Sequence, residues 1–290
     1  MKPSQNIILD KNAIPRLGIG CHKLYGGFEK KRSYKIISAA LDMNINYFDT
    51  APRYGDSEKL LGKILKGNHE VVISSKIGLS AINLSLLNKN NAFIKREFKL
   101  IMKNNFKFAE NYLATKLQKR FDSNLLSFGR NLQSKIPEVF LSEEEIRTSL
   151  YKSLKDLQRN YLDIFFLHEP EQYINIDEIE AIFIKLQNEG LIKHYGLGLH
   201  RYLTKEDNFS SSFITLSMFK KEMLFEENFI SQHSIVHGLM GFYKFGLDSD
   251  FKKKFGEPAD FLYKMSTLHP NKTFLMSPST PEQLKNIKVY

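Results

Sequence analysis

Short apolar runs alternate with helical patterns over the first 78 residues, and this alternation constrains the fold more than any other feature. The runs Leu17–Cys21, Ile45–Asp49 and Glu70–Lys76 have strand character. Between them, Ser33–Met43 and Asp56–Leu65 place apolar residues three or four positions apart, as amphipathic helices do. A β-α-β-α-β order favours parallel strands joined by helical crossovers. We therefore predict an α/β fold.

The same rhythm returns in the second half of the chain. A capping box, Ser142 to Glu145, opens a predicted helix that runs to about Gln158. Further elements follow in order: a strand at Tyr161–His168, a helix at Asp177–Asn188, a strand at Lys193–Leu199, weaker strands near Phe213–Leu216 and Ser231–His237, a last strand at Lys272–Ser277 and a short helix at Pro281–Ile287. About eight β/α units in 290 residues predict a (β/α)8 TIM barrel.

The rhythm is interrupted between Leu79 and about Pro137. This stretch is rich in Lys, Asn and Phe and has helical patches such as Ala92–Met102, so we predict a large, mostly helical insertion after the third strand, for which a lid is one interpretation. Between Ser80 and Glu138, eleven Lys or Arg residues stand against four acidic ones, which supplies +7 of the net charge of +10. The predicted organisation is one barrel domain over residues 1–290, with the basic insertion at 80–138 inside it.

Composition limits the class of protein. The chain is 42% hydrophobic, which suffices for a sizeable core, and no apolar run approaches the roughly 20 residues of a membrane span. The opening residues lack the apolar core of a secretory signal. Cys21 is the single cysteine, so no internal disulfide and no thiolate metal cage is expected. We expect a cytoplasmic protein without a metal centre. The basic segment could bind nucleic acid, but no base-reading module accompanies it, and a solvated surface is the simpler interpretation.

Four ionisable residues fall at or just after the carboxyl ends of predicted strands, where a parallel barrel gathers its catalytic groups. Asp49, Lys76 and His168 each end a strand, and Tyr54 lies on the loop after Asp49. Each residue alone has a structural explanation: packing for the tyrosine, solvation for the lysine and a satisfied core position for the histidine. Four such residues on successive strands favour a shared site.

The set suits proton donation to a carbonyl. A phenol has a pKa of about 10, and a nearby ammonium would stabilise the phenolate and lower that value. Lys76 could act on Tyr54 in this way, with Asp49 keeping the ammonium charged and aimed. His168 could orient the substrate oxygen when neutral or help to donate the proton when charged. Protonation of the oxygen as hydride reaches the carbon is carbonyl reduction, and the hydride requires a cofactor.

These segments together resemble the aldo-keto reductase superfamily. The pattern D-x-A-x-x-Y-G-x-S-E-x-x-L-G is intact from Asp49 to Gly62, and similarity extends over Pro15–Leu79 and Leu141–Leu199. The resemblance implies a (β/α)8 barrel, NADPH-dependent reduction of an aldehyde or ketone, and a catalytic tetrad. By motif match the tetrad falls on Asp49, Tyr54, Lys76 and His168.

The resemblance also implies cofactor contacts. The turn after the first strand, with Gly18, Gly20 and Cys21, would approach the nicotinamide ribose. The usual Ser-Asn after the fifth strand reads Gly198-Leu199 here, followed by His200 and Arg201 as substitutes. Gly238 and Gly241 would allow backbone to approach the pyrophosphate. The last turn resembles the family's adenosine-phosphate site, with Ser277, Ser279, Thr280 and Gln283 as candidate contacts.

Several points stay open at this level. The basic pair that often binds the 2′-phosphate is absent, with Lys285 and Lys288 nearby, so NADP is the expected cofactor and NAD the alternative. The chain ends at Tyr290, and we expect the insertion to replace a C-terminal substrate loop as a pocket wall. The predicted function is NAD(P)H-dependent reduction of a small carbonyl substrate, or the reverse oxidation. The alternative is a barrel of this type that binds nucleotide or a partner with weak or no turnover.

Overall fold

The computed structural model describes residues 15–24, 26, 29–78, 141–168, 176–199, 216–220, 233–241, 243, 250, 253, 256–285 and 287. The chain divides into two units: one combines Met1–Gly78 with Leu141–Tyr290, and the other is Leu79–Phe140. The second unit, and with it the predicted basic insertion, lies outside the described residues. The following description concerns the first unit.

Eight parallel strands close into a barrel in which each strand pairs with the next along the chain and β8 pairs with β1. The strands are β1 (Leu17–Gly20), β2 (Tyr47–Asp49), β3 (Val72–Ile77), β4 (Leu162–His168), β5 (Ile192–Gly198), β6 (Leu216–Lys220), β7 (His233–His237) and β8 (Lys272–Met276). The prediction of a (β/α)8 barrel is confirmed.

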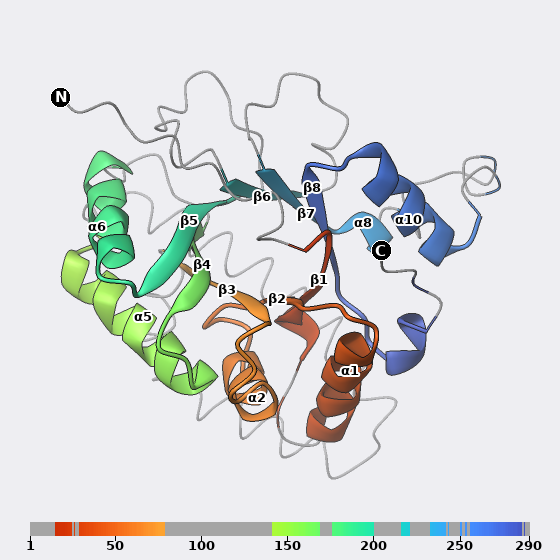
Figure 1. Ribbon diagram of the computed structural model, residues 1–290, viewed down its shortest axis with the longest axis horizontal. Helices are drawn as coiled ribbons and strands as arrows, with labels where there is room; N and C mark the ends of the chain where they lie inside the picture. The colour runs from red at the N-terminus through yellow and green to blue at the C-terminus, as the bar shows by residue number, and fades with distance from the viewer. Residues whose placement is uncertain are drawn as a thin grey trace, which may run out of the picture. The chain divides into compact units, whose positions relative to one another are not determined.

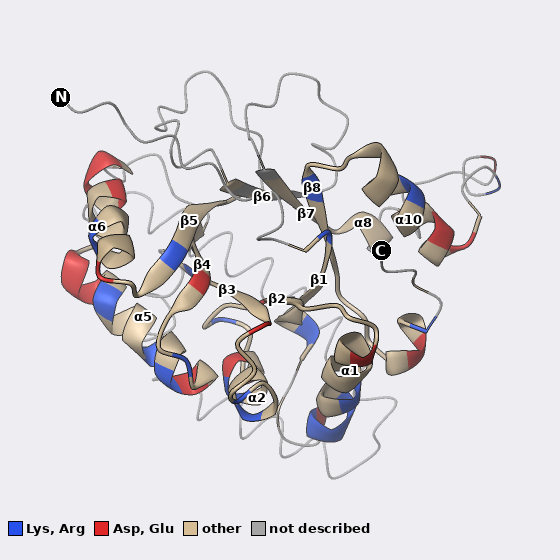
Figure 2. Cartoon of the chain, in the orientation of Figure 1, with Lys and Arg blue, Asp and Glu red and all other residues tan. Residues whose placement is uncertain are grey.

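Helices lie outside the strands (Figure 1). They are α1 (Lys30–Asp42), α2 (Ser57–Ile64), α5 (Glu143–Leu157), α6 (Ile176–Asn188), α8 (Leu239–Gly241) and α10 (Pro258–Leu268), with 3-10 turns η1 (Cys21–Lys23) and η5 (Pro281–Gln283). The predicted capping box is present, because the Ser142 side chain accepts from the Glu145 backbone and the Glu145 carboxylate accepts from that of Ser142. Helices α5 and α6 carry both signs of charge (Figure 2). No helix in the described ranges is long and apolar enough to cross a membrane.

The two-residue period of the strands links the core to the site. Seven residues from β2, β4, β6, β7 and β8 form one buried cluster: Tyr47, Ile164, Phe166, Leu216, Met218, Ile235 and Leu275. Two positions after Tyr47, Phe166 and Leu275 come Asp49, His168 and Ser277. Because side chains alternate along a strand, these residues continue the same face toward the carboxyl ends. The apolar interior therefore ends in polar side chains.

Two predicted elements differ from the structure, and one observed helix was not predicted. Strand β6 begins at Leu216, where the predicted strand ends; the residues before it lie outside the described part. The predicted helix at Pro281–Ile287 is a 3-10 turn over Pro281–Gln283. Helix α10 was not predicted at all, although Pro258 at its start and the buried residues Phe261, Leu262 and Met265 are typical helical signals.

Candidate active site

The four residues of the predicted tetrad line one cavity of 510 Å³ at the carboxyl ends of the strands. Asp49 ends β2, Lys76 lies one residue before the end of β3, and His168 ends β4. Tyr54 comes from the loop between β2 and α2, where its backbone N–H donates to the Ala51 carbonyl at 2.9 Å. The structure thus brings together the four side chains that the sequence analysis singled out.

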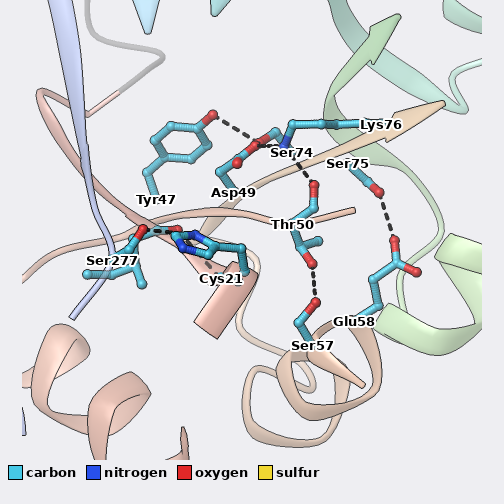
Figure 3. A network of polar contacts seen from close by, with 12 residues as sticks. Cys21, Tyr47, Asp49, Thr50, Ser57, Glu58, Ser74, Ser75, Lys76 and Ser277 are labelled. Carbon is cyan, nitrogen blue, oxygen red and sulfur yellow. Dashed lines mark hydrogen bonds and ion pairs between the residues drawn. The ribbon is translucent and has the colours of Figure 1, made fainter. Parts of the chain in front are cut away.

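Lys76 and Asp49 form a buried ion pair, with side-chain exposures of 2% and 4%. The ammonium also donates to the Thr50 carbonyl at 2.9 Å, and the Ser74 hydroxyl donates to the Asp49 carboxylate at 2.6 Å (Figure 3). Removing two charges from water is costly unless both are paired and hydrogen-bonded. Here both conditions are met, so the lysine is held in a fixed place at the floor of the cavity.

Tyr54 lies above this pair. The Lys76 nitrogen is 5.2 Å from the centre of the Tyr54 ring, and the ring of His22 meets that of Tyr54 edge-on at 6.1 Å between centroids. Burial raises the pKa of the Tyr54 hydroxyl above its ordinary value, and Asp49 raises it further. This net direction is opposite to the lowering that was expected from Lys76. The reason is that burial, the largest cause, disfavours the charged phenolate.

His168 lines the same cavity at the end of β4. A methyl group added at Gly198 of β5 would lie 3.5 Å from its ring, so the glycine leaves the imidazole room at the cavity edge. Gly78, after β3, packs against its carbonyl so closely that an added Cβ would lie 2.2 Å away. The histidine is therefore fixed from both neighbouring strands while its ring faces the cavity.

The predicted cofactor residues separate into three groups. Gly20, Gly198, Gly238 and Ser277 line the same cavity as the tetrad, and Ser279 and Gln283 line a second one. Cys21 lines neither cavity: its thiol is fully buried, with the sulfur 3.5 Å from the Ile19 carbonyl oxygen. His200 lies outside the described residues.

The second cavity, of 650 Å³, runs between α10 and the turn after β8. It shares the lining residues Lys23, Met240 and Ser277 with the first, so the two adjoin. The Lys23 ammonium is 3.4 Å from the Ser277 carbonyl oxygen. At the far end, the Gln283 side chain accepts from the Ser279 backbone N–H at 2.7 Å.

Gly20 lines the first cavity and lies next to Ser277, which lines both cavities. A Cβ added at Gly20 would lie 2.8 Å from the Ser277 hydroxyl, so a side chain there would occupy the passage. Gly238, on the other side, adopts a φ of 81°, a conformation that glycine accommodates without strain. Together the two adjoining cavities, of 510 and 650 Å³, offer room for an elongated ligand.

Sequence analysis missed three of the polar residues that line the first cavity: His22, Lys23 and His237. His22 and Lys23 lie in η1, the turn that follows β1, and His237 ends β7, so the rule about strand ends could have found them. Burial lowers the pKa of His22, as does the positive charge of Lys23, which favours the neutral imidazole. Its Nδ1 lies 3.2 Å from the Ser277 hydroxyl.

The sequence of this chain matches the model of a known family. The model of the aldo/keto reductase family matches residues 16–204, which is more than half of the chain. The protein belongs to the aldo-keto reductase family.

Individual relatives are distant. The chain is 29% identical over 196 residues to a D-threo-aldose 1-dehydrogenase of a Pseudomonas species, and 26% identical over 215 residues to the uncharacterized oxidoreductase YqkF of Bacillus subtilis. These matches cover 64% and 72% of this chain but 50% and 54% of the relatives, so the chain spans about half the length of the curated relatives that it matches. A Klebsiella pneumoniae aldo-keto reductase, solved in complex with NADPH, superposes with a TM-score of 0.58 at 15% identity, over 93% of this chain and 83% of the other.

Proposed function

We propose that this protein catalyses the NAD(P)H-dependent reduction of an aldehyde or ketone to an alcohol, or the reverse oxidation. The observation that carries the proposal is the buried Lys76–Asp49 pair in a cavity that also holds Tyr54 and His168 and adjoins a second cavity. Retaining such groups in one pocket is costly for a protein that only folds or binds. Family membership supports the same reaction class.

In this proposal Tyr54 is the general acid. Because its pKa is raised by burial, the hydroxyl keeps its proton at neutral pH and gives it up only to a strong base. A carbonyl oxygen becomes such a base as its carbon is reduced. The positive charge of Lys76, held in place by Asp49 and the Thr50 carbonyl, would stabilise the phenolate that remains.

His168 would orient the substrate. It lines the same cavity as Tyr54 and Lys76, and its imidazole would donate a hydrogen bond to the carbonyl oxygen. The bound nicotinamide would supply the hydride. Gly20 and Ser277 would hold the cofactor at the junction, and Ser279 and Gln283 would contact its adenosine half in the second cavity.

The form of the cofactor is a finer question. NADP is the family default, and one neighbour was solved with NADPH. In the second cavity, however, the described lining residues include two carboxylates, Glu257 and Glu282, and one cation, Lys23. Carboxylates accept hydrogen bonds from ribose hydroxyls and repel a 2′-phosphate. The charges of the second cavity therefore favour NADH as the alternative cofactor.

A second candidate function is nucleotide or partner binding without efficient turnover. Gly198 and Leu199 favour it, because they offer no side-chain hydrogen bond at the cavity edge where the family carries Ser-Asn. The two functions differ in one observable, the oxidation of bound reduced nicotinamide by an added carbonyl.

Fluorescence titration with NADPH and with NADH, followed by addition of a panel of aldehydes and ketones, tests the proposal. We expect saturable binding of at least one nucleotide and its oxidation by at least one carbonyl. Gly20→Val is the matched control, since its side chain should close the junction and abolish binding in a folded protein. Binding without oxidation would support the second function, and absence of binding in the wild type would contradict the first function and the nucleotide-binding form of the second.

A further inference from the structure

Tyr47 is an unusual component of the barrel interior. It is fully buried and belongs to the interior cluster, whose other members are aliphatic residues, methionine and phenylalanine. A phenylalanine would fill the same space, whereas a buried hydroxyl costs free energy unless it is hydrogen-bonded. The ring is held tightly, because a Cβ on the neighbouring Gly18 would lie 2.5 Å from it. Its hydroxyl is therefore fixed in direction.

That hydroxyl points toward the ion pair. The Tyr47 oxygen lies 2.9 Å from the Ser74 hydroxyl, which in turn donates to the Asp49 carboxylate at 2.6 Å (Figure 3). A serine hydroxyl has a single hydrogen. Since Ser74 gives that hydrogen to Asp49, the tyrosine must be the donor in the first bond. The two hydroxyls thus form a chain with one direction, from Tyr47 through Ser74 to Asp49.

This chain of hydrogen bonds ends on the carboxylate oxygen that also accepts from the Lys76 ammonium. Ser74 and the Lys76 ammonium both donate to the same carboxylate oxygen, Oδ1 of Asp49. Burial raises the pKa of Tyr47 well above its ordinary value, so this donor keeps its proton across the working range of pH. Successive hydrogen bonds strengthen one another in a medium of low dielectric constant. The orientation of the carboxylate is therefore set from inside the barrel.

We infer that Tyr47 and Ser74 are positioning residues: they form a two-hydroxyl relay that fixes Asp49 and, through it, the Lys76 ammonium at Tyr54. The inference rests on the proposed function, because its consequence is measured in carbonyl reduction. Neither residue lines the cavity, so neither touches substrate or cofactor. Their effect should appear in the chemical step and leave nucleotide binding unchanged.

A double-mutant cycle separates positioning from plain structural support. Ser74→Ala removes the donor to Asp49 and leaves the Tyr47 hydroxyl buried without its acceptor. We expect a lower midpoint of thermal unfolding and a fall in kcat of about tenfold to a hundredfold, with the Kd for the reduced nucleotide unchanged. Tyr47→Phe should lower kcat by only about two- to fivefold, because Ser74 still donates.

The double variant Tyr47→Phe/Ser74→Ala gives the decisive result. Removing both hydroxyls leaves no buried tyrosine hydroxyl without an acceptor, so the midpoint of thermal unfolding should return most of the way to the wild-type value. The kcat should stay as low as in Ser74→Ala, because Asp49 still lacks its donor. Ser74→Thr, which keeps the hydroxyl, should recover most of the activity.

Two matched controls lie on the outer face of the barrel. Ser75→Ala removes a hydroxyl that donates to Glu58 at 2.7 Å, and Tyr195→Phe removes a buried hydroxyl that donates to Glu180 at 3.3 Å. Both should change stability and leave kcat within about twofold of the wild type.

The outcomes are distinct. An active wild type with kcat unchanged in Ser74→Ala, or with kcat restored in the double variant, would overturn the relay and leave the proposed function standing. A wild type that binds nucleotide but reduces no carbonyl would overturn the proposed function, and the relay's role in it would fall with it.

Discussion

The two ends of the candidate site are built in different ways. Around β2 and β3, side chains bond to side chains in the buried interior: Lys76 to Asp49, and Ser74 to Asp49. Around β8 and η5, one described contact joins side chains, the Ser277 hydroxyl and His22, and two involve the backbone: the Lys23 ammonium on the Ser277 carbonyl and the Ser279 N–H on Gln283. Proton transfer requires particular ionisable groups, whereas a nucleotide can be held by backbone groups and by the shape of a cavity. The first end therefore tolerates substitution less than the second.

The largest expected effect is on the ion pair. Lys76→Met leaves Asp49 buried without its counter-charge, and we expect the free energy of unfolding to fall by about 3–5 kcal/mol. Chemical denaturation measures this. Lys185→Met is the control, because the Lys185–Glu143 pair is exposed to solvent and should contribute little to stability. Equal effects of the two changes would show that the β2–β3 end is not the more sensitive one.

Two glycines sharpen the comparison. A Cβ at Gly62 of α2 would lie 2.2 Å from the Asp156 carbonyl oxygen of α5, so Gly62→Ala should cost about 1–3 kcal/mol of stability by overpacking. At Gly20 the nearest atom is the Ser277 hydroxyl, a side chain that can rotate. Gly20→Ala should change stability by less than about 1 kcal/mol and weaken nucleotide binding about tenfold. Denaturation and fluorescence titration of both variants test this, and a Gly20→Ala that binds normally would contradict it.

The charges of the second cavity give a smaller effect. Glu282→Arg replaces a carboxylate of the lining with a group that pairs with phosphate. We expect the ratio of the Kd for NADH to the Kd for NADPH to rise about tenfold, because NADPH should bind relatively more tightly. Glu144→Arg, the same change of charge at an exposed position on α5, should leave the ratio unchanged. An unchanged ratio in Glu282→Arg would place the adenosine half elsewhere.

The smallest effect concerns pH. Burial lowers the pKa of His22, His194 and His269 from 6.5. Below that value the unfolded chain binds more protons than the folded chain, so stability is full above about pH 6.5 and falls as the pH decreases. Glu58 opposes this trend, because burial raises its pKa and its protonation favours the folded state. Urea denaturation from about pH 8 to about pH 5.5 should show a modest net loss, and a gain would contradict the assignment of the histidines.

Sequence patterns predicted the β2–β3 end of the candidate site better than the β8–η5 end. Strands β2 to β4 and the predicted tetrad could be located because apolar runs end in ionisable residues. The two-residue period of the strands then brings Asp49, Lys76 and His168 to the same cavity. The rule that site residues lie at strand ends also applies to His22 and His237, which the sequence analysis did not select as site residues.

The second end could not be predicted as well, for a physical reason. Its lining depends on where backbone and apolar side chains come together, as when Leu262 of α10 and Met276 of β8 face one cavity. No local pattern encodes that meeting. The direction of the pKa shift at Tyr54 was also beyond the sequence, because it depends first on how deeply the ring is buried and then on how near Asp49 lies.

The central claim is that the Tyr54 hydroxyl protonates the carbonyl oxygen as hydride is transferred. A single-turnover experiment tests it most directly: the protein, saturated with reduced nicotinamide nucleotide, is mixed with a reactive aldehyde, for the wild type and for Tyr54→Phe. The account predicts equal nucleotide binding by both proteins and oxidation slowed by about 100-fold or more in the variant. Oxidation at the same rate in both would show that another group supplies the proton.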